Sequence, residues 1–214
     1  MRMKKKFKKV LISVLPTGLT NLLRKWLESK QLAEWKRDGY PIPPPHVVKQ
    51  KVIMEYKNQS GYRILVETGT YLGDMVEAQK KRFHKIFSIE LGLDLFNDAK
   101  RRFQNDKNVT IIQGDSGKVL PEILSEINEP AIFWLDGHYS AGITARGEKE
   151  CPIFEELDAI FNHSKYNHIL LIDDARFFNG QGDYPSISAL TDYIRSKNGE
   201  YKVEVKHDII RYLV

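Results

Sequence analysis

The chain has 214 residues, a formal net charge of +5 and a single cysteine, Cys151. This length suits one hydrophobic core with an appendage, and one cysteine excludes an intramolecular disulfide and any multi-cysteine metal site. The charge is uneven, since residues 1–10 carry six basic groups and no acid, whereas residues 41–214 carry 22 basic and 25 acidic groups, so no basic groove for nucleic acid is expected on the body.

Residues 1–30 combine helical apolar spacing with a lysine-rich polar face. Pro16 and Gly18 interrupt the pattern, which predicts two short helices with a break. The arm either packs on the body or on a second subunit of a homo-oligomer, or contacts an anionic membrane surface. No small-residue cleavage site follows and no apolar run reaches the ~18 residues of a bilayer span. We expect a cytoplasmic protein, with the inner face of the membrane as an alternative location.

Residues 1–40 form this basic helical extension, and residues 41–59 hold a proline-rich linker and a covering helix. The run Gly-Tyr-Pro-Ile-Pro-Pro-Pro at residues 39–45 excludes helix and central strand and predicts a stiff linker. Apolar spacing over residues 46–58 predicts a helix that lies over the sheet before its first strand.

Strands and helices alternate through the rest of the chain. We predict strands at 64–66, 85–90, 109–115, 131–136 and 168–174, helices at 94–103, 117–127, 153–161 and 186–196, and a final hairpin of strands 201–206 and 209–213 that turns near His207 and Asp208. Alternation of this kind indicates a parallel sheet covered by helices on both faces, and a tight hairpin is antiparallel. The fold class is therefore α/β, with a Rossmann-like, mostly parallel, seven-stranded sheet and a helical N-terminal extension.

The segment 63–74, Arg-Ile-Leu-Val-Glu-Thr-Gly-Thr-Tyr-Leu-Gly-Asp, predicts a strand, a glycine turn and a helix. Gly69 and Gly73 suit a tight turn that a ligand can approach, and Asp74 suits the first turn of a helix. The dinucleotide fingerprint has three glycines, and this turn has two. An acid two residues before the first glycine, with a second glycine four further on, resembles the first motif of class I S-adenosylmethionine (SAM)-dependent methyltransferases. The alternative is a βα turn of another α/β protein.

Every parallel strand ends in a carboxylate. The acids are Glu67, Glu90, Asp115, Asp136, and Asp173 with Asp174. Parallel strands bring their carboxyl ends to one edge of the sheet, where ligands of such folds bind. Like charges at one edge repel unless cations or hydrogen-bond donors neutralise them. One such acid suits a helix cap, but acids after five successive strands predict a binding site.

Two later segments carry a closer resemblance. Phe133-Trp-Leu-Asp-Gly-His-Tyr-Ser140 and Leu171-Ile-Asp-Asp-Ala-Arg176 resemble the acidic motifs of metal-dependent O-methyltransferases, in particular the macrocin-type (TylF-like) sugar methyltransferases of bacterial polysaccharide and natural-product clusters. The resemblance covers about residues 60–214 and implies a SAM-binding methyltransferase domain there. It implies a divalent cation held by Asp136, Asp173 and Asp174, and an acceptor hydroxyl on a sugar, glycan or other small molecule.

The resemblance also implies a SAM site. Glu67 would lie near the methionine part, Glu90 at the ribose hydroxyls, and Asp115 and Ser116 beside the adenine. The other implied cofactor contacts come from the first turn and the fourth strand: Thr68, Gly69, Thr70, Tyr71, Gly73 and Asp136. Glu90 does not discriminate, because nicotinamide-binding folds place an acid in the same way.

Oxygen ligands without cysteine suit a hard cation, Mg²⁺ first. A cation that binds a sugar hydroxyl lowers its pKa, and Asp136 could take the proton as general base. Consecutive strand residues point to opposite faces, so Asp173 and Asp174 reach one ion only if the strand has ended by Asp174. The alternative is one ligand and one helix cap.

His138 is the rival base if no metal binds. The following loop, residues 139–151, is typical of a lid. We expect acceptor contacts from Tyr139, Arg146, Lys149 and Arg176, with an anionic acceptor such as a nucleotide-sugar suiting the cations. Cys151 is expected to be buried and not catalytic, and His163 and His168 are expected at the surface.

The sequence is compatible with three functions. The first is a SAM- and Mg²⁺-dependent O-methyltransferase, with a metal-independent variant that uses His138. The second is a nicotinamide-dependent oxidoreductase, although the chain lacks both the three-glycine fingerprint and a Tyr-x-x-x-Lys pair. The third is a non-catalytic scaffold in which the basic arm is the functional part.

Overall fold

The structure is a computed structural model that describes residues 17–137 and 150–214. The chain divides into two compact units, residues 1–49 and residues 50–214. Within the described ranges the helices are α2 (Thr17–Arg37), α3 (His46–Ser60), α4 (Asp74–Gln79), α5 (Leu93–Arg102), α6 (Ser116–Glu126), α7 (Ile153–His163), η1 (Ala175–Phe177, a 3-10 turn) and α8 (Ile187–Lys197). Helix α3 begins in the first unit and continues into the second.

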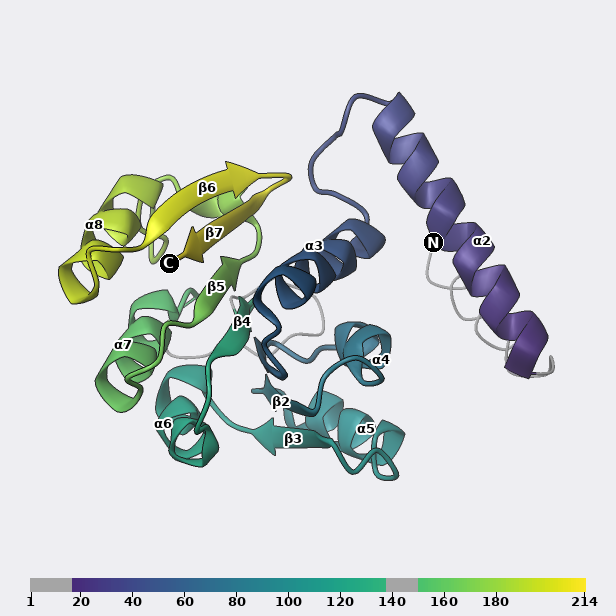
Figure 1. Cartoon of the computed structure of the whole chain (residues 1–214), viewed down its shortest axis with the longest axis horizontal. Coiled ribbons are helices and arrows are strands. Elements are labelled where there is room, and N and C mark those ends of the chain that lie inside the picture. The colour runs from purple at the N-terminus through teal and green to yellow at the C-terminus, as the bar shows by residue number, and fades with distance from the viewer. Residues whose placement is uncertain (1–16, 138–149) are drawn as a thin grey trace. The chain divides into compact units, whose positions relative to one another are not determined.

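Seven strands form one sheet in the order β3-β2-β1-β4-β5-β7-β6 (Figure 1). They are β1 (Ile64–Thr68), β2 (Lys85–Glu90), β3 (Val109–Gln113), β4 (Ala131–Leu135), β5 (Ile169–Ile172), β6 (Lys202–Lys206) and β7 (Ile209–Leu213). The first five pair in parallel, and β7 is antiparallel to both β5 and β6. The predicted fold class is thereby confirmed, as is the hairpin with its turn at His207 and Asp208, both at positive φ.

Alternating strand residues supply two cores, one on each face of the sheet. In β1, Val66 belongs to the core under α6, α7 and α8, whereas Leu65 belongs to the core under α3, α4 and α5. Strand β4 divides in the same way, with Phe133 on the first face and Trp134 on the second. Because both faces are covered, strands β1 and β4 are buried along their whole length and read as continuous apolar runs in the sequence.

Strand order reverses between β1 and β4, the kind of point where ligands bind in open α/β sheets. In the register, Thr68 of β1 pairs with Leu135 of β4, which in turn pairs with Ile172 of β5. The residues that follow, Asp136 and Asp173, therefore leave neighbouring strands at the same level. Register alone thus brings these two carboxylates together.

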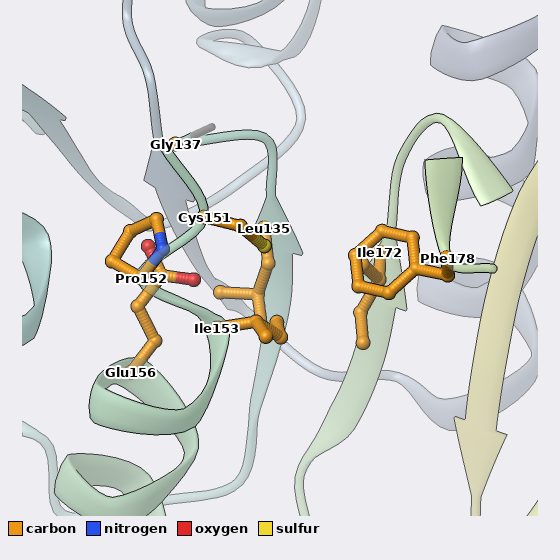
Figure 2. Close-up of a pocket in the computed structure, with 8 residues that line it drawn as sticks. All are labelled: Leu135, Gly137, Cys151, Pro152, Ile153, Glu156, Ile172 and Phe178. Carbon is orange, nitrogen blue, oxygen red and sulfur yellow. The ribbon is translucent and has the colours of Figure 1, made fainter. Parts of the chain in front are cut away.

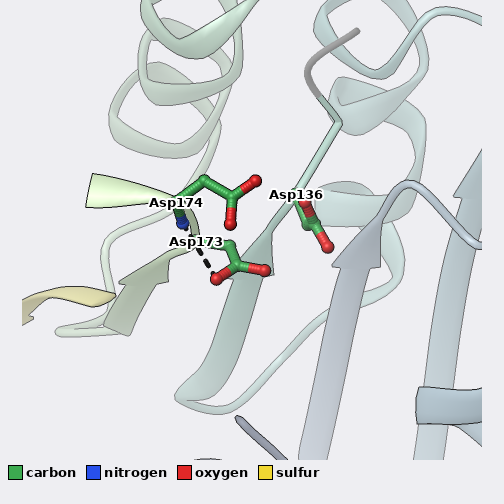
Figure 3. A group of neighbouring side chains, drawn as sticks. All are labelled: Asp136, Asp173 and Asp174. Atoms are coloured by element: carbon green, nitrogen blue, oxygen red, sulfur yellow. Dashed lines mark hydrogen bonds between the residues drawn. The ribbon is translucent and has the colours of Figure 1, made fainter. Parts of the chain in front are cut away.

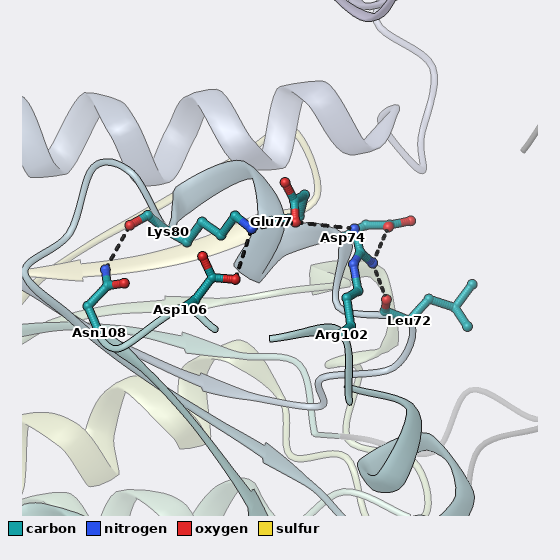
Figure 4. A network of polar contacts seen from close by, with 7 residues as sticks. All are labelled: Leu72, Asp74, Glu77, Lys80, Arg102, Asp106 and Asn108. Carbon is teal, nitrogen blue, oxygen red and sulfur yellow. Dashed lines mark hydrogen bonds and ion pairs between the residues drawn. The ribbon is translucent and has the colours of Figure 1, made fainter. Parts of the chain in front are cut away.

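A polar network fixes the loop after β1 against α5 and the loop that leads into β3 (Figure 4). Arg102 of α5 donates through Nη1 to the carbonyl oxygen of Leu72 and pairs with Asp74 at 2.9 Å. Lys80, at the end of α4, pairs with Asp106 at 2.9 Å, and Asn108 Nδ2 donates to the carbonyl oxygen of Lys80 at 2.7 Å. The network restrains the two ends of α4, and with them the glycine turn that precedes it.

The first unit has its own small core, made by Leu32 and Trp35 of α2 and by Val47 and Val48 at the start of α3. Residues 39–45 are non-helical, as predicted, and Trp35 Nε1 donates to the carbonyl oxygen of Pro41 at 2.8 Å. The predicted break involves Pro16 and Gly18. Helix α2 runs without interruption from Thr17 to Arg37, so Gly18 does not break it, whereas Pro16 lies outside the described residues and a break there stays a prediction. One glycine near a helix end costs about 1 kcal/mol, which the rest of a long helix outweighs. The first predicted helix falls largely on residues 1–16, outside the described ranges.

The two histidines that were expected at the surface differ in burial. His168 is 1% exposed, so its predicted surface position is wrong, whereas His163 is exposed as expected. The Nδ1 atom of His168 accepts from the backbone N–H of Ala131, and burial lowers the pKa of the imidazole to about 4.

In the part of the chain that the structure describes, no helix combines the length and apolar character that crossing a bilayer demands.

Candidate active site

The turn after β1 is shaped by glycine. Gly69 has φ +86°, and its N–H donates to the carbonyl oxygen of Ile89 at 2.9 Å. A Cβ added there would lie 2.4 Å from the backbone oxygen of Asp136. The turn and the end of β4 therefore meet backbone to backbone, and only glycine fits between them.

Glu67, the last residue but one of β1, is buried, at 2% exposure. Ser88 Oγ on β2 donates to its Oε2 at 2.5 Å, and the same hydroxyl lies 2.6 Å from Thr70 Oγ1. Burial, with a smaller contribution from the charge of Glu90, raises the pKa of Glu67 to about 8. A cationic ligand beside this carboxyl would be stabilised by its ionisation.

Titration of Glu67 should be visible in protein stability. Its raised pKa means that the folded protein holds a proton that the unfolded chain releases between about pH 4.5 and 8. The free energy of unfolding should fall as the pH rises through this window, by up to about 1.4 kcal/mol per pH unit from this residue. Glu67→Gln should therefore gain stability relative to the wild type with rising pH, which urea denaturation at several pH values would measure. A difference that stays constant across the window would contradict the assignment.

Glu90 ends β2 and accepts two backbone hydrogen bonds. Tyr71 N donates to Oε2 at 2.7 Å, and Gly92 N donates to Oε1 at 2.9 Å. Tyr71 has φ +48° and an exposed ring. The Glu90 carboxylate thus joins the glycine turn to the loop after β2, which is where the predicted ribose contact would lie.

Asp115 and Ser116 lie at the start of α6. Asp115 caps the helix, with Oδ1 accepting from Gly117 N at 3.1 Å, so the cap role that a single strand-end acid can have is realised here. Ser116 Oγ donates to Glu156 Oε1 of α7 at 2.6 Å. Glu156 is 2% exposed. The sequence did not predict a role for it, since all that marks it there is its place in a pair of acids, Glu155 and Glu156, in the first turn of α7.

Three carboxylates meet beyond β4 and β5 (Figure 3). Asp136, Asp173 and Asp174 each offer a ligand atom, and these atoms lie within 4.8 Å of one another. The backbone N–H of Asp136 is fixed by Thr68, whose carbonyl oxygen and Oγ1 accept it at 3.2 and 3.1 Å. Asp173 N donates to the carbonyl oxygen of Leu135 at 3.1 Å. The predicted convergence of the three aspartates is therefore present in the fold.

The requirement placed on Asp173 and Asp174 is met. Strand β5 ends at Ile172, and Asp174 adopts the left-handed region at φ +55°, so the two side chains no longer alternate across a sheet. Asp174 N donates to Asp173 Oδ1 at 2.8 Å, and Asp174 makes no side-chain cap bond to the η1 turn. The alternative in which one of the pair is a helix cap is not what the geometry shows.

Arg176 supplies a positive charge next to the three aspartates. Its Nη1 donates to Asp174 Oδ1 at 2.8 Å and also to Asp208 Oδ2. Despite partial burial, hydrogen bonds and charges from the two aspartates raise the pKa of Arg176, which keeps it protonated. The donors of the three aspartates are all oxygen atoms, which suit a hard divalent cation such as Mg²⁺, so these side chains fit the predicted metal.

Figure 2 shows a small pocket among β4, β5 and the start of α7. Leu135 and Gly137, which flank Asp136 in the chain, and Ile172, which precedes Asp173, all line it. The complete lining is mostly apolar and consists of Leu135, Gly137, Cys151, Pro152, Ile153, Glu156, Ile172 and Phe178. Cys151 is buried, as predicted, and burial raises the pKa of its thiol to about 12, so it stays protonated. Within this lining Glu156 is the only carboxylate, and a Cβ on Gly137 would lie 2.8 Å from its Oε1.

The predicted base His138 and the predicted acceptor contacts Tyr139, Arg146 and Lys149 lie outside the described residues, so their roles stay predictions. Past that loop, Glu150 N donates to Asp183 Oδ2 at 2.8 Å. The neighbouring Tyr184 is half-buried, and burial together with charges that include Asp174 and Asp136 raises its pKa. The ring of Tyr184 packs against Phe178, with ring centroids 5.6 Å apart.

Comparison with known proteins agrees with this architecture. No family model and no curated protein matches the sequence. Among solved structures, the O-methyltransferase TomG from Streptomyces achromogenes, involved in tomaymycin synthesis and bound to SAM, aligns over 87% of this chain and 88% of its own, with 14% identity and a TM-score of 0.56. An O-methyltransferase from Bacillus cereus in complex with S-adenosylhomocysteine (SAH) aligns over 87% and 90%, with 13% identity and a TM-score of 0.55.

A third similar structure is the SAH-bound Podospora anserina methyltransferase PaMTH1, which covers 94% of this chain and 97% of its own, with 13% identity and a TM-score of 0.53. Likeness at such identities concerns the arrangement of the backbone and not the acceptor. The chain therefore has the seven-stranded, Rossmann-like fold of SAM-dependent methyltransferases.

Proposed function

We propose that the protein is a SAM-dependent O-methyltransferase that uses a divalent cation held by Asp136, Asp173 and Asp174. The observation that carries the proposal is the approach of these carboxylates to within 4.8 Å of one another, at the edge of the sheet where Gly69 meets the backbone of Asp136. Solved structures with the same fold are described as complexes with SAM or SAH, which supports the cofactor. The macrocin-type resemblance adds Mg²⁺ and a sugar or glycan acceptor.

The cofactor contacts follow from the first turn. Glu67 would face the ammonium group of SAM, since a buried carboxyl with a raised pKa gains most from a cation. Glu90 would bind the ribose hydroxyls from a position fixed by two backbone N–H groups. Ser116, with Asp115 at the start of α6, would border the adenine. Thr68, at the end of β1, and the turn residues Gly69, Thr70, Tyr71 and Gly73 would contact the bound SAM.

Asp136 is the proposed base. A bound cation would lower the pKa of the acceptor hydroxyl, and the Asp136 carboxylate would receive its proton. SAM, when bound, would supply the methyl group: the acceptor oxygen would form a bond to the methyl carbon while the carbon–sulfur bond breaks, which would give a methyl ether and SAH. Since the sulfonium is already a good leaving group, orientation is the main contribution of the protein.

Acceptor recognition is proposed to involve Tyr139, Arg146 and Lys149 from the loop after β4 and Arg176 from η1. The metal-independent alternative, with His138 as base, makes a different prediction about chelators. In that case SAH would form equally well in the presence of EDTA.

Calorimetric titration tests the proposal directly. SAM and NADH are titrated into the full chain, each with and without Mg²⁺. Saturable SAM binding without NADH binding supports the methyltransferase, and the reverse result supports the nicotinamide-dependent oxidoreductase. Absence of SAM binding under both conditions would overturn the proposal.

We also propose that the basic arm contacts an anionic membrane surface. Leu22 and Trp26, one turn apart on α2, are 66% and 59% exposed, and Lys30 lies 5.6 Å from the Trp26 ring centroid. Exposed apolar side chains with lysines and six basic groups in residues 1–10 suit an anionic lipid surface.

Vesicle sedimentation tests the membrane contact. The full chain should pellet with vesicles that contain phosphatidylglycerol and stay in solution with phosphatidylcholine alone, and Trp26→Ala should weaken the association by about tenfold. No pelleting, together with a Trp26-dependent dimer in analytical ultracentrifugation, would show that the face binds a second copy instead.

A further inference from the structure

Asp174 needs support from outside its own segment. Its backbone is in the left-handed region at φ +55°, which an aspartate adopts at a cost of about 1 kcal/mol. Its carboxylate is held close to two others that carry the same charge. Both features are unfavourable for the isolated turn, so contacts with another element must maintain them.

The supporting contacts come from the β6–β7 turn, about thirty residues further along the chain. The backbone carbonyl oxygen of Asp208 accepts from Ala175 N at 2.9 Å, and its Oδ1 accepts from Arg176 N at 2.9 Å. Its Oδ2 accepts from Arg176 Nη1, the same atom that donates to Asp174 Oδ1. The side chain of Asp208 is 1% exposed, so the Asp208 end of this link is shielded from water.

We propose that Asp208 is a positioning residue of the metal centre, acting through Arg176 on Asp174; the inference rests on the proposed function. Asp208 fixes the backbone of residues 175 and 176 and anchors the guanidinium. The guanidinium holds one carboxylate oxygen of Asp174, and a carboxylate has a second oxygen that can coordinate a cation. This arrangement gives Arg176 a structural role in the site, distinct from the acceptor contact expected from the sequence.

The same geometry admits an opposite interpretation, in which Arg176 competes with the metal by neutralising the aspartates itself. The two roles differ in sign. If Arg176 positions Asp174, its removal weakens metal binding, whereas if it competes, its removal strengthens metal binding. The buried Asp208 anchors Arg176 from the β7 side of β5, whereas Asp136 follows β4 on the other side of β5. This anchoring favours the positioning role.

The test measures Mn²⁺ affinity by electron paramagnetic resonance and SAH affinity by calorimetry, on the full chain. Mn²⁺ is a suitable probe because it accepts the same oxygen ligands as Mg²⁺. Asp208→Asn and Arg176→Gln should each weaken Mn²⁺ binding by about tenfold or more, the usual effect of removing an outer-shell partner. SAH affinity should change less than about twofold, because the glycine turn is untouched; a general loss of structure would weaken both ligands.

Glu129→Gln is the matched control. It removes a carboxylate from another interelement ion pair, with Arg63 at 3.0 Å, and should leave Mn²⁺ and SAH affinity unchanged, because Arg63 precedes β1 and Glu129 precedes β4, so that both lie at the opposite edge of the sheet. Arg176→Gln, at a side chain that is 28% exposed, keeps the test decisive if Asp208→Asn does not fold.

Unchanged Mn²⁺ affinity in a folded Asp208→Asn or Arg176→Gln variant, or tighter binding in the latter, would overturn the positioning role while leaving the metal centre intact. Absence of Mn²⁺ binding by the wild type would overturn both the metal centre and the positioning role.

Discussion

Asp136→Asn should lower the rate of methyl transfer at least about 1,000-fold and weaken Mn²⁺ binding at least about 100-fold, since one side chain is proposed as both metal ligand and base. The amide of asparagine is neutral, coordinates a hard cation more weakly and cannot accept the proton. The substitution conserves size and keeps the backbone N–H that Thr68 accepts, so the fold should survive. SAH release on an acceptor found in a panel of sugars and polyols gives the rate.

Asp158→Asn is the control for this substitution. Asp158 lies on α7, is half-exposed, and pairs with Lys197 at 3.4 Å, so the variant should match the wild type in both measurements. Loss of rate with unchanged Mn²⁺ affinity would restrict Asp136 to the base role. Full activity of Asp136→Asn would exclude the three aspartates as the reaction centre. Wild-type activity that resists EDTA would instead favour the alternative with His138.

Much of the site follows from sequence because parallel strands convert position along the chain into position in space. Apolar runs that end in an acid locate both the strands and their carboxyl ends, and a regular register brings Asp136 and Asp173 to the same level. The turn chemistry of Gly69 is equally local, since a positive φ and a close backbone approach demand glycine.

What the sequence did not indicate depends on contacts between distant segments. The contact of Glu156 with the site is visible only in the fold, where Ser116 of α6 donates to it. The contact of Asp208 with Arg176 likewise requires that the β6–β7 turn pack beside η1. His168 looked like a surface residue because its loop is polar, but its ring lies 4.9 Å from that of Phe133. Gly18, which was expected to interrupt a helix together with Pro16, lies inside α2, because a single glycine costs a helix only about 1 kcal/mol.

Gly69→Ala should impair the cofactor site more than any other single-methyl change in the turn. The new Cβ would lie 2.4 Å from the backbone oxygen of Asp136, and a backbone atom cannot rotate away as a side chain can. Either the turn or the end of β4 must shift, which separates the cofactor loop from the proposed base. We expect a stability loss of about 2–5 kcal/mol, combining left-handed strain with overpacking, and SAH affinity reduced at least about 100-fold.

Gly61→Ala separates the two causes. Gly61 has φ +74°, close to the φ +86° of Gly69, but a Cβ there meets nothing within 4 Å. It should therefore lose only the strain, about 1 kcal/mol, and bind SAH normally. Denaturant titration gives the stability and calorimetry the affinity. If both variants lost the same stability and bound SAH equally well, the contact between the glycine turn and Asp136 would have no part in holding the cofactor. A loss of SAH affinity in Gly69→Ala alone would show that cofactor binding depends on the contact between the ends of β1 and β4. The strand order reverses there, and Asp136, the first of the three clustered aspartates, follows β4 at this point.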